Sequence, residues 1–246
     1  MRVRFRFAKL GKVRWTSHRD LARMWERALR RAQLPVVYTG GFTPRPKVSF
    51  GLALPTGHES VAEYLDVEFV ADDLDVPSLP ARLSAALPVG IDVSAAAAVN
   101  GADTSLQEQV TSSTWWLEAV GAPFDQVDQT VEAALAAESL IITRQRKGSD
   151  VVDDVRPSII AIEVSELVAC ATDGHAPGAV LVAELATHPR SLRPAELLVA
   201  LSAHHPVGLR EGHVRRTHQW STRDGARWEP LPLDATNAPH AKARAS

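Results

Sequence analysis

The segment RVRFRFAK, residues 2–9, alternates between two kinds of side chain. In an extended chain successive side chains point to opposite faces, so the apolar Val3, Phe5 and Phe7 would share one face and the three arginines the other. This period of two predicts a half-buried β-strand. We therefore expect residues 2–9 to be the first strand of a sheet that has one apolar face.

The pattern changes to helical spacing after this strand. Ser17 is a typical helix N-cap, with Asp20 three residues later in the position of a capping box. Apolar residues recur at helical spacing from Leu21 to Ala32, and Pro35 ends the helix. The elements expected next are a Gly- and Pro-rich loop at 40–46, strands at 47–54 and 61–70, a helix at 78–87 and a strand at 91–99. This order is typical of a ferredoxin-like fold.

The same order returns after a polar, small-residue-rich stretch at 100–113, which we interpret as a linker. The elements expected beyond it are strands at 114–121, 140–147, 158–164, 179–186 and 214–220 and helices at 124–137 and 194–203. We therefore expect an α+β protein of two tandem ferredoxin-like (βαββαβ) halves, residues 1–99 and 114–228, packed as one compact unit, with an additional strand in the second half. The Pro- and Ala-rich tail, 229–246, is expected to be disordered.

The composition is that of an ordinary globular protein of 246 residues, 45% hydrophobic and 23% charged. Its single cysteine, Cys170, excludes an intrachain disulfide and favours a reducing compartment. The basic amino terminus lacks the apolar region of a secretory signal, and no apolar run approaches the roughly 20 residues that span a bilayer. We therefore expect a cytoplasmic protein without membrane association.

Charge is distributed unevenly, although the net charge is only −2. Residues 1–50 contain thirteen Lys and Arg against two acidic residues, a net of +11. Residues 51–140 contain fifteen acidic residues against Arg82 alone, a net of −14. Either the basic segment has an anionic partner, or the two segments neutralise each other within the fold.

The arginines of the first strand are the clearest case of this choice. On a sheet face that no helix covers, they would be available to bind the phosphate groups of RNA. Alternatively, the neighbouring strand at 61–70 would place Tyr64, Asp66 and Glu68 opposite them, and cross-strand ion pairs would neutralise the row. The sequence leaves both possibilities open.

The candidate substrate-binding residues come from the first helix, the Gly- and Pro-rich loop with Lys47, and the basic group of the second half: His18, Arg19, Arg23, Gly41, Phe42, Arg45, Lys47, Arg144 and Arg156. His18 falls in the first turn of the first helix, where a helix N-terminus favours anions, and it could also act as a general base toward a ribose hydroxyl. In the loop at 40–46, glycines free the backbone and prolines stiffen it, as is typical of loops that carry function.

Residues 16–32, 41–50 and 55–66 carry a resemblance to a known family. They include the stretches Thr16-Ser17-His18-Arg19-Asp20-Leu21, Gly41-Phe42-Thr43-Pro44-Arg45-Pro46-Lys47-Val48-Ser49-Phe50 and Glu63-Tyr64-Leu65-Asp66. These stretches resemble the radical-SAM-linked family known as domain of unknown function 2344. The resemblance continues at Arg144, Lys147 and Asp154-Val155-Arg156-Pro157 and covers nearly all of residues 1–220.

The resemblance implies a partner, a radical-SAM protein with a cobalamin-type domain that is fused to such chains or encoded beside them. It also implies a genomic neighbourhood of ribonuclease and ribosomal-protein genes. This chain departs from the family pattern at Thr43 and Arg45, where Asn and His are expected, and at Arg19, where an apolar residue is commoner. Neither Thr43 nor Arg45 is therefore expected to be an indispensable catalytic group.

Radical chemistry itself is not expected in this chain. A radical-SAM cluster is usually held by three cysteines in a C-x-x-x-C-x-x-C run, and this sequence has one cysteine. Phosphate loops of the G-x-x-x-x-G-K type, dinucleotide-binding fingerprints and H-E-x-x-H zinc helices do not occur in it. His204-His205 has no third ligand at metal spacing. We expect no metal, no cofactor and, on balance, no enzymatic activity.

The sequence thus favours a non-catalytic accessory or substrate-recognition protein for a radical-SAM partner, binding RNA or a ribonucleoprotein. One alternative is a metal-independent RNA-processing enzyme that uses His18 with Arg45 and Lys47 around a phosphate. Another is a protein–protein adaptor without affinity for RNA. Whether the basic residues are exposed or paired is the geometric fact that bears most on this choice.

Overall fold

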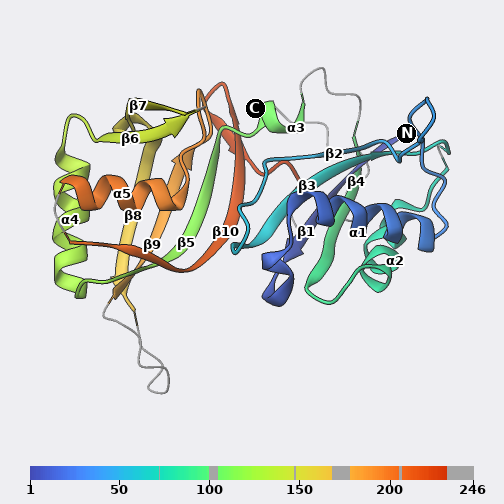
Figure 1. The fold of residues 1–246 in the computed structure, drawn as a ribbon. Helices are drawn as coiled ribbons and strands as arrows, with labels where there is room; N and C mark the ends of the chain where they lie inside the picture. Colours follow the sequence, from blue (N-terminus) through green and yellow to red (C-terminus); the bar gives the residue numbers. More distant parts are fainter. Residues whose placement is uncertain (72, 100–104, 147, 168–177, 205–206, 232–246) are drawn as a thin grey trace. The chain divides into compact units, whose positions relative to one another are not determined.

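The computed structural model describes residues 1–71, 73–99, 105–146, 148–167, 178–204 and 207–231. Helices and strands are mixed along the chain (Figure 1), so the predicted α+β class is confirmed. The chain divides into two compact units, Met1–Val110 together with the residues from Gln219 on, and Thr111–His218. Of the expected linker, residues 100–104 lie outside the described residues, and Leu106–Gln109 form helix α3.

In the first unit, a sheet with strand order β4-β1-β3 carries two helices on one face, and β2 also pairs with β3. The pairs β1–β3, β1–β4 and β2–β3 are antiparallel. The elements of this unit are β1 (Arg2–Lys9), the 3₁₀ helix η1 (Gly11–Trp15), α1 (His18–Arg31), β2 (Val48–Phe50), β3 (Glu59–Glu68), η2 (Val76–Ser78), α2 (Leu79–Ala86), β4 (Ile91–Val99) and α3.

The apolar side of the first strand becomes the core of this unit. Helix α1 begins where the sequence predicts, because the Ser17 hydroxyl accepts a hydrogen bond from the backbone N–H of Asp20. The ring of the buried Trp25 then packs 6.0 Å from Phe5 and 5.1 Å from Phe7, measured between ring centroids. The alternation in residues 2–9 therefore fixes which face of the sheet receives the helix.

The opposite face of this sheet is covered as well. A small apolar cluster lies there, formed by Ala62, Tyr64, Ala95, Leu106 and Leu231. Leu106 comes from α3, and Leu231 comes from the stretch that was expected to be a disordered tail. Residues 229–231 are packed in the structure, and the remainder of that stretch, 232–246, lies outside the described residues.

In the second unit, the sheet order is β10-β5-β9-β8, and β6 and β7 form a separate antiparallel hairpin. The elements are β5 (Ser112–Val120), α4 (Phe124–Ala136), β6 (Ile141–Arg146), β7 (Ser149–Asp154), η3 (Arg156–Ser158), β8 (Ile159–Glu166), β9 (Gly178–Ala186), α5 (Pro194–His204) and β10 (Arg210–Arg223). Strand β10 begins in this unit and from Gln219 belongs to the first, where β11 (Ala226–Trp228) pairs with it. Cys170 lies outside the described residues.

None of the helices in the described part of the chain has both the length and the apolar composition that crossing a membrane requires.

Candidate functional site

The arginines at the start of β1 are paired with carboxylates of the neighbouring strand. In the register of β1 with β3, Arg2 lies opposite Glu68 and Arg4 lies opposite Asp66. Arg4 donates two hydrogen bonds to Asp66, at 2.8 Å from Nε and 3.0 Å from Nη2, and the two residues are only 5% and 7% exposed. The Arg2–Glu68 ion pair, at 3.4 Å, is more open to solvent. For Arg2 and Arg4, the sequence left open either phosphate binding or cross-strand ion pairs. The structure contains the cross-strand ion pairs.

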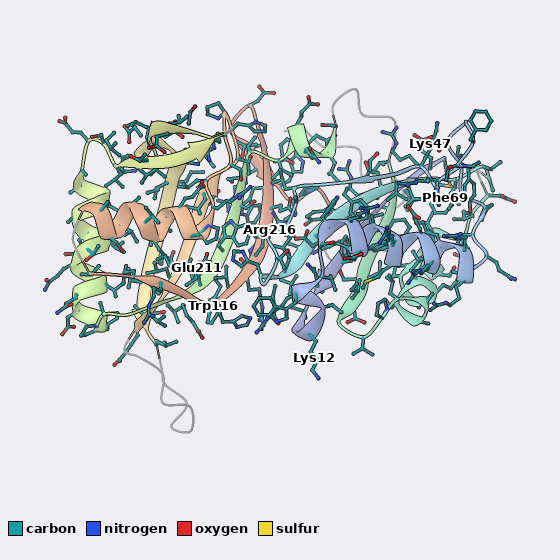
Figure 2. All side chains as sticks on the ribbon, in the orientation of Figure 1. Lys12, Lys47, Phe69, Trp116, Glu211 and Arg216 are labelled. Carbon is teal, nitrogen blue, oxygen red and sulfur yellow. The ribbon has the colours of Figure 1, made fainter. Side chains whose placement is uncertain are left out.

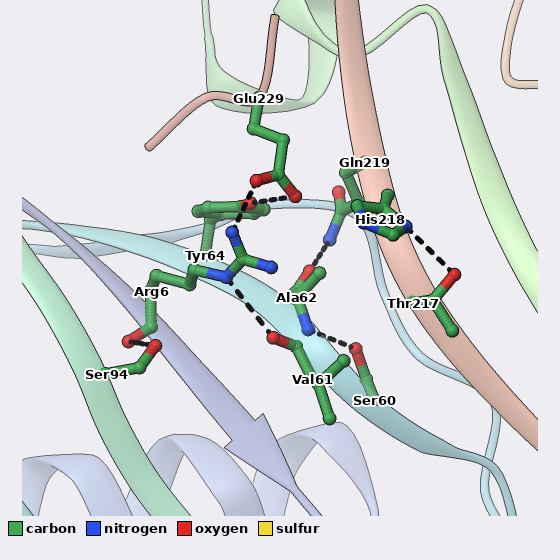
Figure 3. A network of polar contacts seen from close by, with 10 residues as sticks. All are labelled: Arg6, Ser60, Val61, Ala62, Tyr64, Ser94, Thr217, His218, Gln219 and Glu229. Carbon is green, nitrogen blue, oxygen red and sulfur yellow. Dashed lines mark hydrogen bonds and ion pairs between the residues drawn. The ribbon is translucent and has the colours of Figure 1, made fainter. Parts of the chain in front are cut away.

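Arg6 is neutralised by a residue that the sequence analysis did not consider. It is ion-paired with Glu229, and its guanidinium lies 5.8 Å from the centre of the Tyr64 ring (Figure 3). The Tyr64 hydroxyl donates to the other carboxylate oxygen of Glu229 at 3.4 Å. Burial raises the pKa of Tyr64 well above its usual range, so the phenol stays neutral and can act as a donor. The arginine row is therefore not an exposed anion-binding surface.

A different group of cations is exposed around the start of α1. We define the η1–α1 surface as Lys12, Arg14, Trp15, His18, Arg19 and Arg23. Figure 2 shows the Lys12 side chain pointing away from the ribbon. The indole of Trp15 is 64% exposed, and the Arg14 guanidinium lies 5.3 Å from the centre of its ring. This arrangement places a flat aromatic face among positive charges.

Local backbone geometry holds Trp15 in place. Its ring packs over Gly57, where a Cβ atom would lie 2.8 Å from the indole and where φ is +92°. Both observations require glycine at this position. On the other side, the buried ammonium of Lys9 donates to the carbonyls of Thr16 at 2.9 Å and Arg14 at 3.3 Å. The turn that carries the exposed indole is thus fixed from both sides.

Positive charge remains on this surface after its ion pairs are considered. Arg14 contacts Glu59 at 3.6 Å, and Arg23 contacts Asp20 at 3.3 Å. The hydrogen bond from Ser17, with help from Arg23, lowers the pKa of the Asp20 carboxyl, so this carboxylate stays ionised. Lys12 and Arg19 are both exposed and add two further cations. The surface is therefore suited to attract an anion.

His18 lies beside a small pocket at the start of α1. Its ring contacts Phe50 edge to face, with the centroids 5.0 Å apart. The pocket is also lined by Lys9 and Glu63. Burial lowers the pKa of Lys9, and the nearby Glu63 carboxylate partly offsets this effect. The Lys9 ammonium already binds the backbone carbonyls of Arg14 and Thr16. We therefore assign Lys9 a structural role, which is to hold the turn before α1.

The loop after α1 is a short hairpin with an exposed aromatic tip. Tyr38 pairs with Pro46, and the backbone N–H of Thr39 donates to the carbonyl of Arg45 at 2.8 Å. Phe42 is fully exposed at the tip, next to the exposed Gly41. Arg45 is exposed as well. These three candidates therefore lie together, in a position where they can meet a partner.

His18 and Lys47 are not brought together. The ring of His18 contacts Phe50, and the side chain of Phe50 packs against the core that the helices cover. Lys47 lies three positions earlier in an extended segment, which places its side chain on the opposite face. Its ammonium contacts Glu68 at 3.3 Å, beside Arg2. The structure therefore offers no shared phosphate site for His18 and Lys47.

The two candidates in the second unit serve its own packing. Arg144 binds Glu196 at 2.7 Å and Asp153 at 3.3 Å. Arg156 donates to the carbonyls of Leu135 at 2.9 Å and Ile159 at 3.1 Å. These contacts tie β6 to α5, and η3 to the end of α4 and the start of β8. Neither guanidinium is presented as an open binding group.

Sequence reasoning did not select Lys12 or Trp15. The signal that could have found them is an aromatic residue set between basic ones immediately before a helix N-cap, in Lys12-Val13-Arg14-Trp15. Among the residues that the structure describes, no group of three or more His, Cys, Asp or Glu side chains could hold a metal ion.

Two solved structures were matched to this chain. A crystal structure of a Cbf5-Nop10-Gar1 complex matches with a TM-score of 0.50 and 9% sequence identity, over 88% of this chain and 48% of that chain. A structure of an H/ACA RNP bound to a substrate RNA containing 2'-deoxyuridine matches with a TM-score of 0.46 and 15% identity, over 89% and 47%. This chain thus spans about half the length of the matched chains. At such identity the first likeness is one of fold.

No curated protein has a matching sequence. The family described as an uncharacterized protein conserved in bacteria (DUF2344) matches residues 2–194, which include β1, the η1–α1 surface and the hairpin with Phe42. This chain therefore belongs to the DUF2344 family of bacterial proteins.

Proposed function

We propose that this protein is a non-catalytic recognition protein that binds RNA or a ribonucleoprotein through the η1–α1 surface and the tip of the 38–46 hairpin. One observation carries the proposal. The guanidinium groups of Arg4 and Arg6 are buried in ion pairs, whereas Lys12, Trp15 and Arg19 are exposed around the start of α1.

The chemistry of these residues suits single-stranded RNA. Cations that track the phosphate backbone give a sequence-independent and salt-dependent affinity. An exposed aromatic ring adds stacking with a base, worth about 1–3 kcal/mol for each base. Trp15 and Phe42 are exposed rings, and each lies near exposed basic residues. An arrangement of this kind recognises RNA by charge and stacking and requires no catalytic group.

The structure matched with a TM-score of 0.50 is a protein complex, and its low identity transfers no residue role to this chain. We also propose that the two units are tandem ferredoxin-like halves. The antiparallel pairs β4–β1, β1–β3 and β3–β2 support this, as does the order β10-β5-β9-β8 in the second unit.

We further propose that the partner is a radical-SAM protein with a cobalamin-type domain, that this partner catalyses the reaction, and that both proteins act in the cytoplasm. This part of the proposal rests on the family resemblance. It is compatible with the single cysteine of these 246 residues, which cannot form a C-x-x-x-C-x-x-C cluster motif.

The test is a titration of labelled single-stranded RNA at several salt concentrations. The variant Lys12→Ala/Arg19→Ala removes two exposed charges from the proposed surface. The matched control, Arg193→Ala/Arg210→Ala, removes two exposed charges from the second unit. If both mutated residues of the first variant contact phosphates, the slope of log affinity against log salt should fall by about 1.4, since each contact contributes about 0.7 for a single strand.

The control should keep the parental slope. Equal loss in both variants would mean that net charge alone determines binding, and the assigned surface would be wrong. No RNA binding by the parent at low salt, together with retention of a radical-SAM partner, would instead identify a protein–protein adaptor.

A further inference from the structure

Residues 229–231 lie on the sheet of the first unit in the way that a bound peptide would. The carboxylate of Glu229 is ion-paired with Arg6 and accepts the hydrogen bond of the Tyr64 hydroxyl (Figure 3). The carbonyl of Pro230 accepts from Nη1 of Arg4 at 3.5 Å. The side chain of Leu231 is buried in the small cluster with Ala62, Tyr64, Ala95 and Leu106. Residues 229–231 belong to no helix or strand.

The groups that hold this segment are themselves fixed by other contacts. Arg6 also donates to the carbonyl of Val61 at 3.3 Å. Arg4 is held by Asp66 and by the side-chain oxygen of Gln109, at 3.1 Å. The donors are therefore positioned without the segment, and such preorganisation favours binding.

The site recognises two side chains of the bound segment, and one residue separates them. A carboxylate is recognised by a guanidinium and a phenol, and two residues later an aliphatic side chain enters an apolar hollow. We propose that this face is a binding site for an acidic-X-aliphatic peptide of a partner protein, and that Glu229–Leu231 occupies the site intramolecularly when the partner is absent. This inference is independent of RNA binding at the η1–α1 surface.

A peptide fits the observed contacts better than RNA does. Arg6 beside Tyr64 would also suit a phosphate and a base. The hollow formed by Ala62, Ala95 and Leu106, however, takes an aliphatic side chain, which RNA lacks. Residues 229–231 directly follow β11, which pairs with β10, so this covalently linked occupant acts at a high effective concentration and a partner peptide must compete with it. The occupied site would thus select for partners of high affinity or high local concentration.

The test uses the full chain with the substitutions Glu229→Gln and Leu231→Ala, which weaken the intramolecular occupant. The probe is a labelled, end-blocked synthetic peptide with the sequence of residues 226–231, and binding is followed by fluorescence polarisation. We expect the double variant to bind this peptide at least ten-fold more tightly than the parent does. A control peptide with Gln and Ala at the two recognised positions should not bind either protein.

Circular dichroism and thermal unfolding establish that the double variant is folded. If it is not, Glu229→Gln alone takes its place, with the same expected direction. A folded variant that gains no affinity for the peptide overturns the proposal, since the segment is then only a structural cover. A gain for a single-stranded RNA of about 12 nucleotides and none for the peptide overturns it as well. Because RNA binding at the η1–α1 surface is measured separately with Lys12→Ala/Arg19→Ala, either hypothesis can fail alone.

Discussion

Replacing Asp66 by Asn would leave the Arg4 guanidinium buried without its counter-charge. The two residues are 5% and 7% exposed and share two hydrogen bonds of 2.8 and 3.0 Å. Removing one partner of a buried pair typically costs about 3–5 kcal/mol. Arg4 retains contacts with Gln109 and with the carbonyl of Pro230, so we expect the lower end of this range, about 3 kcal/mol.

The same pair of strands provides a matched control. Glu68 pairs with Arg2 two positions along the register from Asp66, but both side chains are 35% exposed. Exposed ion pairs contribute about 0–1 kcal/mol, so Glu68→Gln should reduce the free energy of unfolding by less than about 1 kcal/mol. Glu68 also contacts Lys47 at 3.3 Å, so this control removes two exposed ion pairs, and a smaller loss than in Asp66→Asn shows the effect of burial.

Urea unfolding followed by circular dichroism measures both variants, because urea does not screen charge. We expect the Asp66→Asn variant to lose about 3 kcal/mol and to melt roughly 6–12 °C lower than the parent. The double variant Arg4→Met/Asp66→Leu should recover most of the loss, because no charge is then left buried. Equal effects of Asp66→Asn and Glu68→Gln would refute the claim that Arg4 and Asp66 form a buried ion pair.

Three further predictions concern single residues. Burial raises the pKa of Tyr64 above its ordinary value of 10.0, so the folded state retains a proton that the unfolded chain releases, and stability should fall as the pH rises above that value. Tyr64→Phe should flatten this fall, which urea unfolding between about pH 9 and about pH 11 would detect. Ser17→Ala removes the cap of α1 and should cost about 1 kcal/mol in thermal unfolding; an unchanged melting temperature would contradict the cap. Phe42→Ala should leave stability within about 0.5 kcal/mol. Its RNA affinity should fall by about 1–3 kcal/mol, and an unchanged affinity would remove the hairpin tip from the interface.

Features determined by neighbouring residues could be predicted from the sequence. The strand Arg2–Lys9 has the predicted bounds, and α1 begins directly after Ser17. Alternation in two strands was also enough to place Asp66 and Glu68 opposite the arginines, although the observed strand, Glu59–Glu68, is shifted from the predicted 61–70. These predictions succeed because the period of two in a strand determines which side chains share a face.

Short elements escaped prediction for a different reason. Helix α3 is four residues long, so it has no periodicity to detect, although Ser105 and Glu108 form a capping box. Strand β7, Ser149–Asp154, contains three aspartates and lies largely exposed in a two-stranded hairpin, so no apolar alternation marks it. β2 was expected to reach Leu54 but ends at Phe50.

Which side chains of the candidate site are exposed depends mainly on contacts between residues that are far apart in the sequence. Glu229, which neutralises Arg6, lies 223 positions away, and the composition of its segment suggested disorder. The exposure of Trp15 depends on packing over Gly57, 42 positions later. Local pattern cannot reveal such pairings, because the fold brings these residues together. The sequence therefore predicted a basic surface on α1 but could not show which of the basic residues of the first unit are buried in ion pairs and which are exposed.

Crosslinking of bound RNA, followed by identification of the crosslinked peptides by mass spectrometry, tests the central claim most directly. If the η1–α1 surface and the hairpin tip contact RNA, crosslinks should map to residues 11–23 and 38–46, at Trp15 and Phe42 above all. Crosslinks concentrated on β1 and β3, at Tyr64 or its neighbours, would contradict the claim and would return RNA binding to the arginine row.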